Sequence, residues 1–232
     1  MIFGLDLTSP LFWSAFGSIV LANIVLSGDN AVVIAMAART LKPEQRGKAI
    51  FWGSAAAIVM RIVLTIVAIQ LLSLPYLKIV GAVLLVYIGV DLLKGEDDGD
   101  GEGKEINGMM AAIRTILIAD LVMSLDNVLA VAAAAKGNLP LLVIGLLISI
   151  PLIIFGATLL TKVMERFPII ITVGAALLGF LAGEMLVTDP AATAQFGAVS
   201  HTVELIAGLA GAGLVVALGT YLSKQKNSSE SL

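Results

Sequence analysis

The sequence predicts an all-α membrane protein with seven transmembrane helices, arranged as two inverted three-helix repeats followed by a C-terminal helix. Three observations lead to this fold class. The 232-residue chain is 59% hydrophobic and 13% charged, with a mean hydropathy of +1.02, whereas soluble domains are only about half apolar. The apolar stretches run about 20 residues, the length of a membrane-spanning helix, and lack the roughly ten-residue alternation of a β-barrel. A polar motif in the first stretch recurs in the fourth.

Each predicted span is an apolar run long enough to cross the bilayer. The first and fourth spans carry the repeated motif, the second contains Arg61, and the third and sixth contain Asp91 and Glu184. The last span has no counterpart in the repeat. The seven spans are residues 11–36, 48–72, 76–93, 109–135, 139–160, 168–187 and 203–222.

The repeated motif is the strongest indication of two copies of one unit. Four polar residues of the first span recur 97 positions later in the fourth: Asn23, Ser27, Asp29 and Asn30, then Asp120, Ser124, Asp126 and Asn127. A second match, at an offset of 93, aligns residues 75–93 with 168–186 and pairs Asp91 with Glu184. Internal repeats of this kind are typical of transporters.

These repeats divide one transmembrane transport domain, residues 1–232. The first repeat covers about 11–93, and the second covers about 109–187. An acidic cytoplasmic linker, 94–108, joins them, and the seventh helix covers about 203–222.

The distribution of Lys and Arg predicts the orientation of the spans. Two basic residues, Lys78 and Lys136, lie on one side of the membrane, and Arg61 lies within a span. The other side holds eleven: Arg39, Lys42, Arg46, Lys48, Lys94, Lys104, Arg114, Lys162, Arg166, Lys224 and Lys226. The side with eleven should be the cytoplasm, so the N-terminus is outside and the C-terminus inside. Because each repeat has an odd number of spans, the second enters the membrane the opposite way up.

Charged residues within the spans point to a site in the membrane interior. A charge at the bilayer centre costs about 2.5–3.5 kcal/mol, so Asp29, Asp120, Asp126 and Arg61 should face inward, where they need partners or a bound cation. If the motif spans pack antiparallel, Asp29 lies level with Asp120. On a continuous helix Asp29 points away from the other motif residues, and a local unwinding at Gly28 would redirect it. Leu125 takes the place of that glycine in the second copy.

The predicted ligands are carboxylates, amide oxygens and hydroxyls. The chain has no cysteine, and this oxygen-rich set suits Mn²⁺, Mg²⁺ or Ca²⁺ better than Zn²⁺ or Cu⁺. The candidate ligands are Asn23, Ser27, Asp29, Asn30, Asp120, Ser124, Asp126 and Asn127. Arg61, Asp91 and Glu184 are candidate relays or gates. The simpler alternatives stay open: polar residues that only join helices, acids at the membrane interface, and a structural ion pair of Arg61.

The doubled motif, the span with Arg61 and the Asp91 and Glu184 match resemble the TerC family of integral membrane proteins, and in particular its short bacterial branch of metal transporters. The resemblance covers residues from about 10 to 222. It implies seven spans, a relation to the lysine-exporter superfamily, Mn²⁺ export and a location in the bacterial plasma membrane. It also implies that the acids Asp29, Asp120, Asp126 and Glu184 matter for transport.

The sequence therefore predicts a secondary transporter that exports Mn²⁺ or a similar hard divalent cation by alternating access. It contains no phosphate-binding Gly-x-x-x-x-Gly-Lys-Ser/Thr run, so an ion gradient or the membrane potential would supply the energy. Two alternatives stay open: an exporter of cationic amino acids and a non-transporting assembly factor for membrane proteins. An enzyme is not expected, because the spans hold no Ser/His pair or His-rich motif.

The expected partners are the lipid bilayer and the transported metal ion, with no resident cofactor and no nucleic acid. Small residues permit close contact of helices, either within the chain or between chains of an oligomer. They lie in the sixth and seventh spans: Gly179, Gly183, Gly208, Gly211, Gly213 and Gly219.

Overall fold

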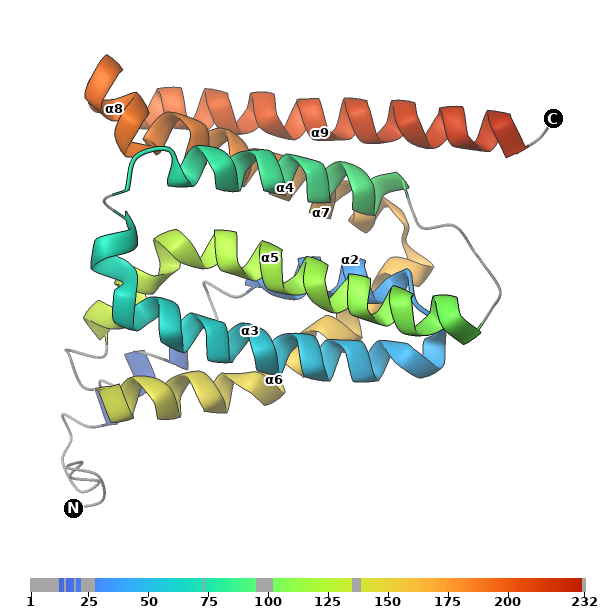
Figure 1. Ribbon diagram of the computed structural model, residues 1–232, viewed down its shortest axis with the longest axis horizontal. Helices are drawn as coiled ribbons and strands as arrows, with labels where there is room; N and C mark the ends of the chain where they lie inside the picture. Colours follow the sequence, from blue (N-terminus) through green and yellow to red (C-terminus); the bar gives the residue numbers. More distant parts are fainter. Residues whose placement is uncertain are drawn as a thin grey trace.

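Helices make up nearly all of the described chain in the computed structural model (Figure 1). The backbone is described over residues 13–14, 16–18, 20–21, 28–72, 74–94, 102–134 and 139–230. Within those ranges, the side chains of 68–72, 102–107, 126–134, 139, 141–142 and 226–230 are outside the description. The described ranges contain no strand, which confirms the all-helical fold class.

The described helices follow the predicted spans in order. They are α2 (Gly28–Arg39), α3 (Pro43–Leu72), α4 (Leu77–Lys94), α5 (Glu102–Ala134), α6 (Leu139–Arg166), α7 (Ile169–Thr188), α8 (Pro190–Phe196) and α9 (His201–Glu230). Five of them are long and apolar enough to cross a membrane: α3, α5, α6, α7 and α9. The described α2 covers only the second part of the first predicted span, and α4 combines 18 residues with charged side chains near its ends. The count of seven spans and the inverted repeat stay predictions.

Several helices extend beyond their predicted spans into polar sequence. Helix α5 begins at Glu102, so the second part of the predicted linker 94–108 is helical, and α6 continues to Arg166. Hydropathy marks only the apolar section of a helix, whereas the hydrogen-bonded backbone continues through Lys, Glu and Gln, which are good helix formers. Helix α8 was not predicted, because its seven residues are too few to show as an apolar span.

The helices pack as two bundles. Helices α2, α3, α5 and α6 form the first bundle, in which both α5 and α6 pack against α2 and α3. Helices α4, α7 and α9 form the second bundle. Fewer contacts join the two bundles, chiefly from α4 to α5 and from α2 to α7. In Figure 1 the second bundle lies above the first. The buried core includes Met36 of α2, Ile116 of α5, Leu146 of α6, Leu85 of α4 and Leu178 of α7. Large apolar side chains also cover the outer surface, as a lipid environment permits.

The predicted glycine faces meet within one chain. A Cβ atom at Gly179 would overlap the backbone of Gly211, and one at Gly183 would overlap the Ala207 carbonyl. Helices α7 and α9 can therefore approach so closely only because these positions lack side chains. Gly213, by contrast, has no atom within 4 Å of an added Cβ. Whether a second chain binds elsewhere stays a prediction.

Contacts between helix ends follow the predicted sides of the membrane. At the end rich in basic residues, Arg39 Nη2 donates to the Leu92 carbonyl at 2.9 Å, and Arg46 forms an ion pair with Glu165. At the opposite end, the loop after α7 contacts the start of α4 through Asp189. Residues assigned to one side from sequence are therefore neighbours in space.

Candidate cation site

A buried ion pair joins α3 to α5. Arg61 Nη2 lies 2.5 Å from Asp120 Oδ1, and Arg61 Nε donates a hydrogen bond of 3.0 Å to Ser124 Oγ. The serine hydroxyl in turn donates to Asp120 Oδ2 at 3.3 Å. Arg61 is 1% exposed, Asp120 6% and Ser124 0%. The Arg61 guanidinium thus neutralises the charge of Asp120. We call these three residues the arginine cluster.

The sequence explains why these groups meet. Asp120 and Ser124 are four residues apart, so they share one face of α5, which is continuous across Leu125. Helix α3 packs along that face and brings Arg61 to it. The long guanidinium side chain then reaches both groups from within the helix core. A pair this deeply buried is stable only when its polar atoms are hydrogen-bonded, as they are here.

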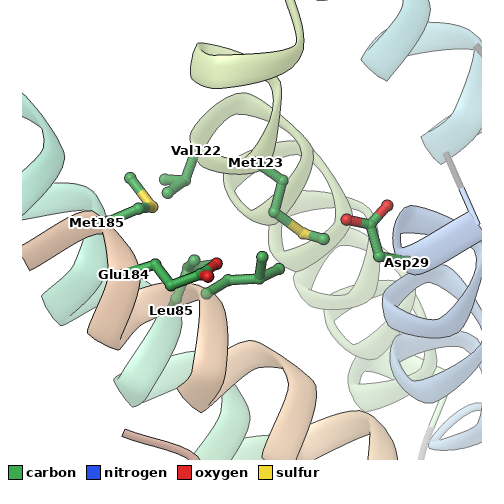
Figure 2. A pocket seen from close by; sticks show the side chains of 7 residues that line it. Asp29, Leu85, Val122, Met123, Glu184 and Met185 are labelled. Atoms are coloured by element: carbon green, nitrogen blue, oxygen red, sulfur yellow. The ribbon is translucent and has the colours of Figure 1, made fainter. Parts of the chain in front are cut away.

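A second group of acids lines a pocket of about 70 Å³ between the two bundles. Asp29 of α2 and Glu184 of α7 both line it (Figure 2). The other lining residues are Met123 and Val122 of α5, Leu85 of α4, and Leu181 and Met185 of α7. A water molecule needs about 10–15 Å³ of such volume, so the pocket has room for an ion with several waters. We call it the carboxylate pocket.

Asp29 lies in the first turn of the described helix α2. Its carboxylate accepts a hydrogen bond of 2.8 Å from the backbone N–H of Asn30, a favourable position for an acid. The charges of Arg61 and Asp120 also act on this carboxylate, so the pocket and the arginine cluster are electrostatic neighbours. Asn30 is 2% exposed, and its side-chain amide has no hydrogen-bond partner among the described residues.

The remaining predicted residues fall in two groups. Asn23 and Ser27 lie outside the described residues, as do the side chains of Asp126 and Asn127, whose backbone belongs to α5. Asp91 is exposed near the end of α4 and does not line the pocket. Among the described side chains, no three of the His, Cys, Asp and Glu type gather closely enough to hold a metal ion. Among the described residues, two acids, Asp29 and Glu184, therefore line one pocket, and a third acid, Asp120, lies nearby and is neutralised by Arg61.

Comparison with known proteins identifies the family. The model of the integral membrane protein TerC family matches residues 8–227. This chain belongs to the TerC family. It is 44% identical over 187 residues to the uncharacterized membrane protein YjbE of Bacillus subtilis, covering 79% of this chain and 85% of that protein. No solved structure matches the chain.

More distant relatives are also membrane proteins. The chain is 28% identical to the uncharacterized membrane protein YceF of Bacillus subtilis, over 97% of this chain and 88% of that protein. It is 26% identical to the UPF0053 inner membrane protein YoaE of Escherichia coli, over 71% of this chain and 35% of that protein. This TerC chain is therefore a multi-pass integral membrane protein, as predicted.

The sequence reasoning missed Asp189, a buried acid outside the spans of this TerC protein. It accepts backbone N–H bonds from Tyr76 at 2.9 Å, Lys78 at 3.0 Å and Ile79 at 3.3 Å at the start of α4, and from Ala191 at 2.7 Å as the N-cap of α8. Burial alone would raise the pKa of Asp189, but these donors outweigh burial and hold its pKa below the usual aspartate value. Asp189 followed by Pro190 is a helix-start signal that could have revealed it.

The two pocket methionines were also missed. Met123 is 6% exposed and Met185 is 5% exposed, and each is adjacent in sequence to a polar residue that had been singled out. Sequence alone treats a buried methionine as an apolar core residue. Only the packing of α4 against both α5 and α7 brings these two methionines to the lining of one pocket with two carboxylates.

Proposed function

We propose that this TerC protein is a secondary transporter that exports Mn²⁺ or a similar divalent cation from the cytoplasm by alternating access. One observation carries the proposal: Asp29 and Glu184, one from each predicted repeat, line a single pocket within the membrane-spanning part of the chain. Two acids facing one cavity in an apolar medium repel each other, and a divalent cation relieves that repulsion.

The helix contacts support a site between two related halves. If α2, α3 and α4 correspond to α5, α6 and α7, each helix contacts its own counterpart. The packing of α2 on α6 also has its equivalent in the packing of α5 on α3. Such reciprocal contacts are expected of two repeats related by an axis in the membrane plane, where substrate sites of transporters lie. The proposed ligands from the motif, including Asn23, Ser27, Asp126 and Asn127, would join the acids there in one of the access states.

The pocket favours an ion over an amino acid. Its volume of about 70 Å³ is far below the roughly 300–1,000 Å³ of small-molecule sites. A cationic amino acid would also bring a carboxylate, yet the described lining contains no Arg or Lys to bind it. Arg61 already pairs with Asp120.

In this proposal Arg61 acts as a built-in cation. Arg61 neutralises Asp120 while the pocket is empty. A metal ion bound beside Asp29 would compete with Arg61 for the negative charge of that neighbouring carboxylate. The proposal includes neither an enzymatic activity nor a resident cofactor, because the metal ion is the cargo. The inside-negative membrane potential opposes the outward movement of a cation by about 2.3 kcal/mol per charge per 100 mV, so an ion exchanged in the opposite direction would drive export.

The test is the manganese content of cells challenged with Mn²⁺, measured by elemental analysis at matched expression. Cells with the wild type should retain less Mn than cells with Asp29→Asn or Glu184→Gln. Glu44→Gln is the matched control, since it makes the same chemical change as Glu184→Gln at an exposed position outside the pocket. Equal Mn content for wild type and Asp29→Asn would contradict the proposal and favour an assembly role.

Two further measurements separate the alternatives. Deletion of the gene should make added Mn²⁺ toxic and leave the tolerance of added lysine unchanged; the reverse result would favour the amino-acid exporter. Asp126→Asn should behave like Asp29→Asn if the second motif contributes a ligand. Wild-type Mn content in cells with Asp126→Asn would remove that residue from the site.

A further inference from the structure

The carboxylate pocket contains two kinds of donor atom. Asp29 and Glu184 supply carboxylate oxygens, and Met123 and Met185 supply thioether sulfurs. In Figure 2 the Met123 side chain points toward the Asp29 carboxylate, and Glu184 and Met185 are adjacent residues of α7 on the opposite side. Both methionines are buried, so their sulfur atoms lie in a water-poor part of the molecule. The pocket is thus a mixed oxygen and sulfur environment.

The two repeats differ at these positions. The residue of the first repeat that corresponds to Met123 is Leu26, and the one that corresponds to Met185 is Leu92. Leucine and methionine have similar volumes, and a protein core usually tolerates an exchange between them. The first repeat therefore has leucine at both corresponding positions, whereas the second repeat has a sulfur atom at both, and both of these methionines line the pocket.

We propose that Met123 and Met185 make the carboxylate pocket selective for soft and borderline divalent cations over Ca²⁺ and Mg²⁺. The inference rests on the proposed function and specifies its substrate class. Carboxylates bind every divalent cation, whereas thioethers bind soft metals and offer little to hard ones. The sulfur atoms should increase the binding affinity most for Cd²⁺. They should increase it modestly for Mn²⁺, which is among the hardest of the divalent transition metals, and should not increase it for Ca²⁺ or Mg²⁺.

The test compares Cd²⁺ with Ca²⁺, which have nearly the same ionic radius, so that their difference reports donor softness rather than size. Binding of each ion to the purified full-length chain in detergent is measured by titration calorimetry. Met123→Leu/Met185→Leu should weaken Cd²⁺ binding about tenfold and leave Ca²⁺ binding within about twofold. The single variants should each lose part of that Cd²⁺ affinity, and they serve if the double variant does not fold.

Two controls separate the possible outcomes. Met164→Leu makes the same change at a fully buried methionine of α6 that does not line the pocket, so it should leave both affinities unchanged. Asp29→Asn should weaken the binding of both ions, because it removes a carboxylate.

If the double variant and the wild type have the same ratio of Cd²⁺ to Ca²⁺ affinity while Asp29→Asn weakens both, the methionine inference is wrong and the proposed function stands. An equal loss of Cd²⁺ affinity in Met164→Leu would also overturn it. If the wild type binds neither ion, or if Asp29→Asn changes neither affinity, the proposed function and this inference both fail.

Discussion

The acids of the arginine cluster and of the carboxylate pocket lie in different environments. Asp120 lies inside one bundle, where Arg61 and Ser124 from α3 and α5 satisfy both of its oxygens. Asp29 and Glu184 lie between the two bundles, where their carboxylates share a cavity. An acid paired with an arginine inside one bundle contributes to the fold, whereas carboxylates that line a cavity between two bundles are placed where a ligand can reach them. We therefore expect substitutions in the arginine cluster to have their largest effect on stability, and substitutions of the pocket acids to have their largest effect on transport.

The largest effect on stability is expected from breaking the arginine cluster. Arg61→Ala leaves Asp120 buried without its partner, and such a change costs about 3–5 kcal/mol of the free energy of unfolding. Denaturant unfolding of the purified protein in detergent measures it. The double variant Arg61→Ala/Asp120→Ala should recover part of the loss, and the exposed Arg114→Ala should have little effect. Losses in the double variant that equal the sum of the two single losses would show that the pair is not coupled.

The next effect concerns the support of the pocket. Gly183 precedes Glu184 and packs against the α9 backbone, so Gly183→Ala should force α7 and α9 apart at a cost of about 1–3 kcal/mol. Because the shift moves Glu184, export of Mn²⁺ should fall as well. Thermal unfolding and the cellular Mn content give the two readings. Gly213→Ala, where an added Cβ meets open space, is the matched control, and equal losses in both variants would mean that the close contact is not what matters.

Asp189 offers a third way of holding a buried acid, with backbone N–H groups only. Asp189→Ala should cost about 1–2 kcal/mol, because it uncaps both α4 and α8. Since the pKa of Asp189 is lowered in the folded protein, its contribution is present at neutral pH and is lost as the pH falls below the ordinary aspartate pKa of about 3.9. The difference in stability between wild type and variant should therefore be largest at pH 7 and become smaller as unfolding is measured at lower pH, down to pH 3. A constant difference would contradict this account.

The smallest effect on stability is expected in the pocket itself. Asp29→Asn should change the free energy of unfolding by no more than about 0.5 kcal/mol, since its carboxylate accepts a hydrogen bond from the Asn30 backbone N–H that an amide oxygen can also accept. Export of Mn²⁺ should nevertheless fall about tenfold or more, because the affinity of an oxygen site depends on its charge. Unfolding and transport measured on the same preparation test the separation. A large loss of stability would place Asp29 with Asp120 as a structural acid.

The sequence was sufficient to predict the helical class and the family, and it identified charged residues that the structure buries or places in a pocket. Apolar runs of membrane length identify helices, and a charge within such a run must face inward, so Asp29, Asp120 and Arg61 could be recognised without coordinates. The pairing of Arg61 with Asp120 was left open among several acids. It depends on which face of α3 packs against α5, and no local pattern in the sequence determines that register.

Other parts of the site could not be inferred from residue types. Glu184 was treated as a relay or gate, and its position beside Asp29 follows only from the packing of α7 across the gap between the bundles. Met123 and Met185 resemble any other core methionines until that packing is known. The role of Asp189 depends on a contact that is distant in sequence, because this residue caps a helix that begins more than a hundred positions earlier in the chain.

The division into two bundles has a mechanical consequence. Asp189 ties α4 to the corner after α7, and Arg46 with Glu165 ties α3 to α6, so each bundle is braced internally. Arg39 of α2 meets Leu92 of α4 at one end of the seam between them. The two bundles are thus joined near the basic end, and Asp29 and Glu184 lie on opposite sides of the gap between them. If transport proceeds by separation of the bundles, a cation held between these acids would be released with every helix still intact.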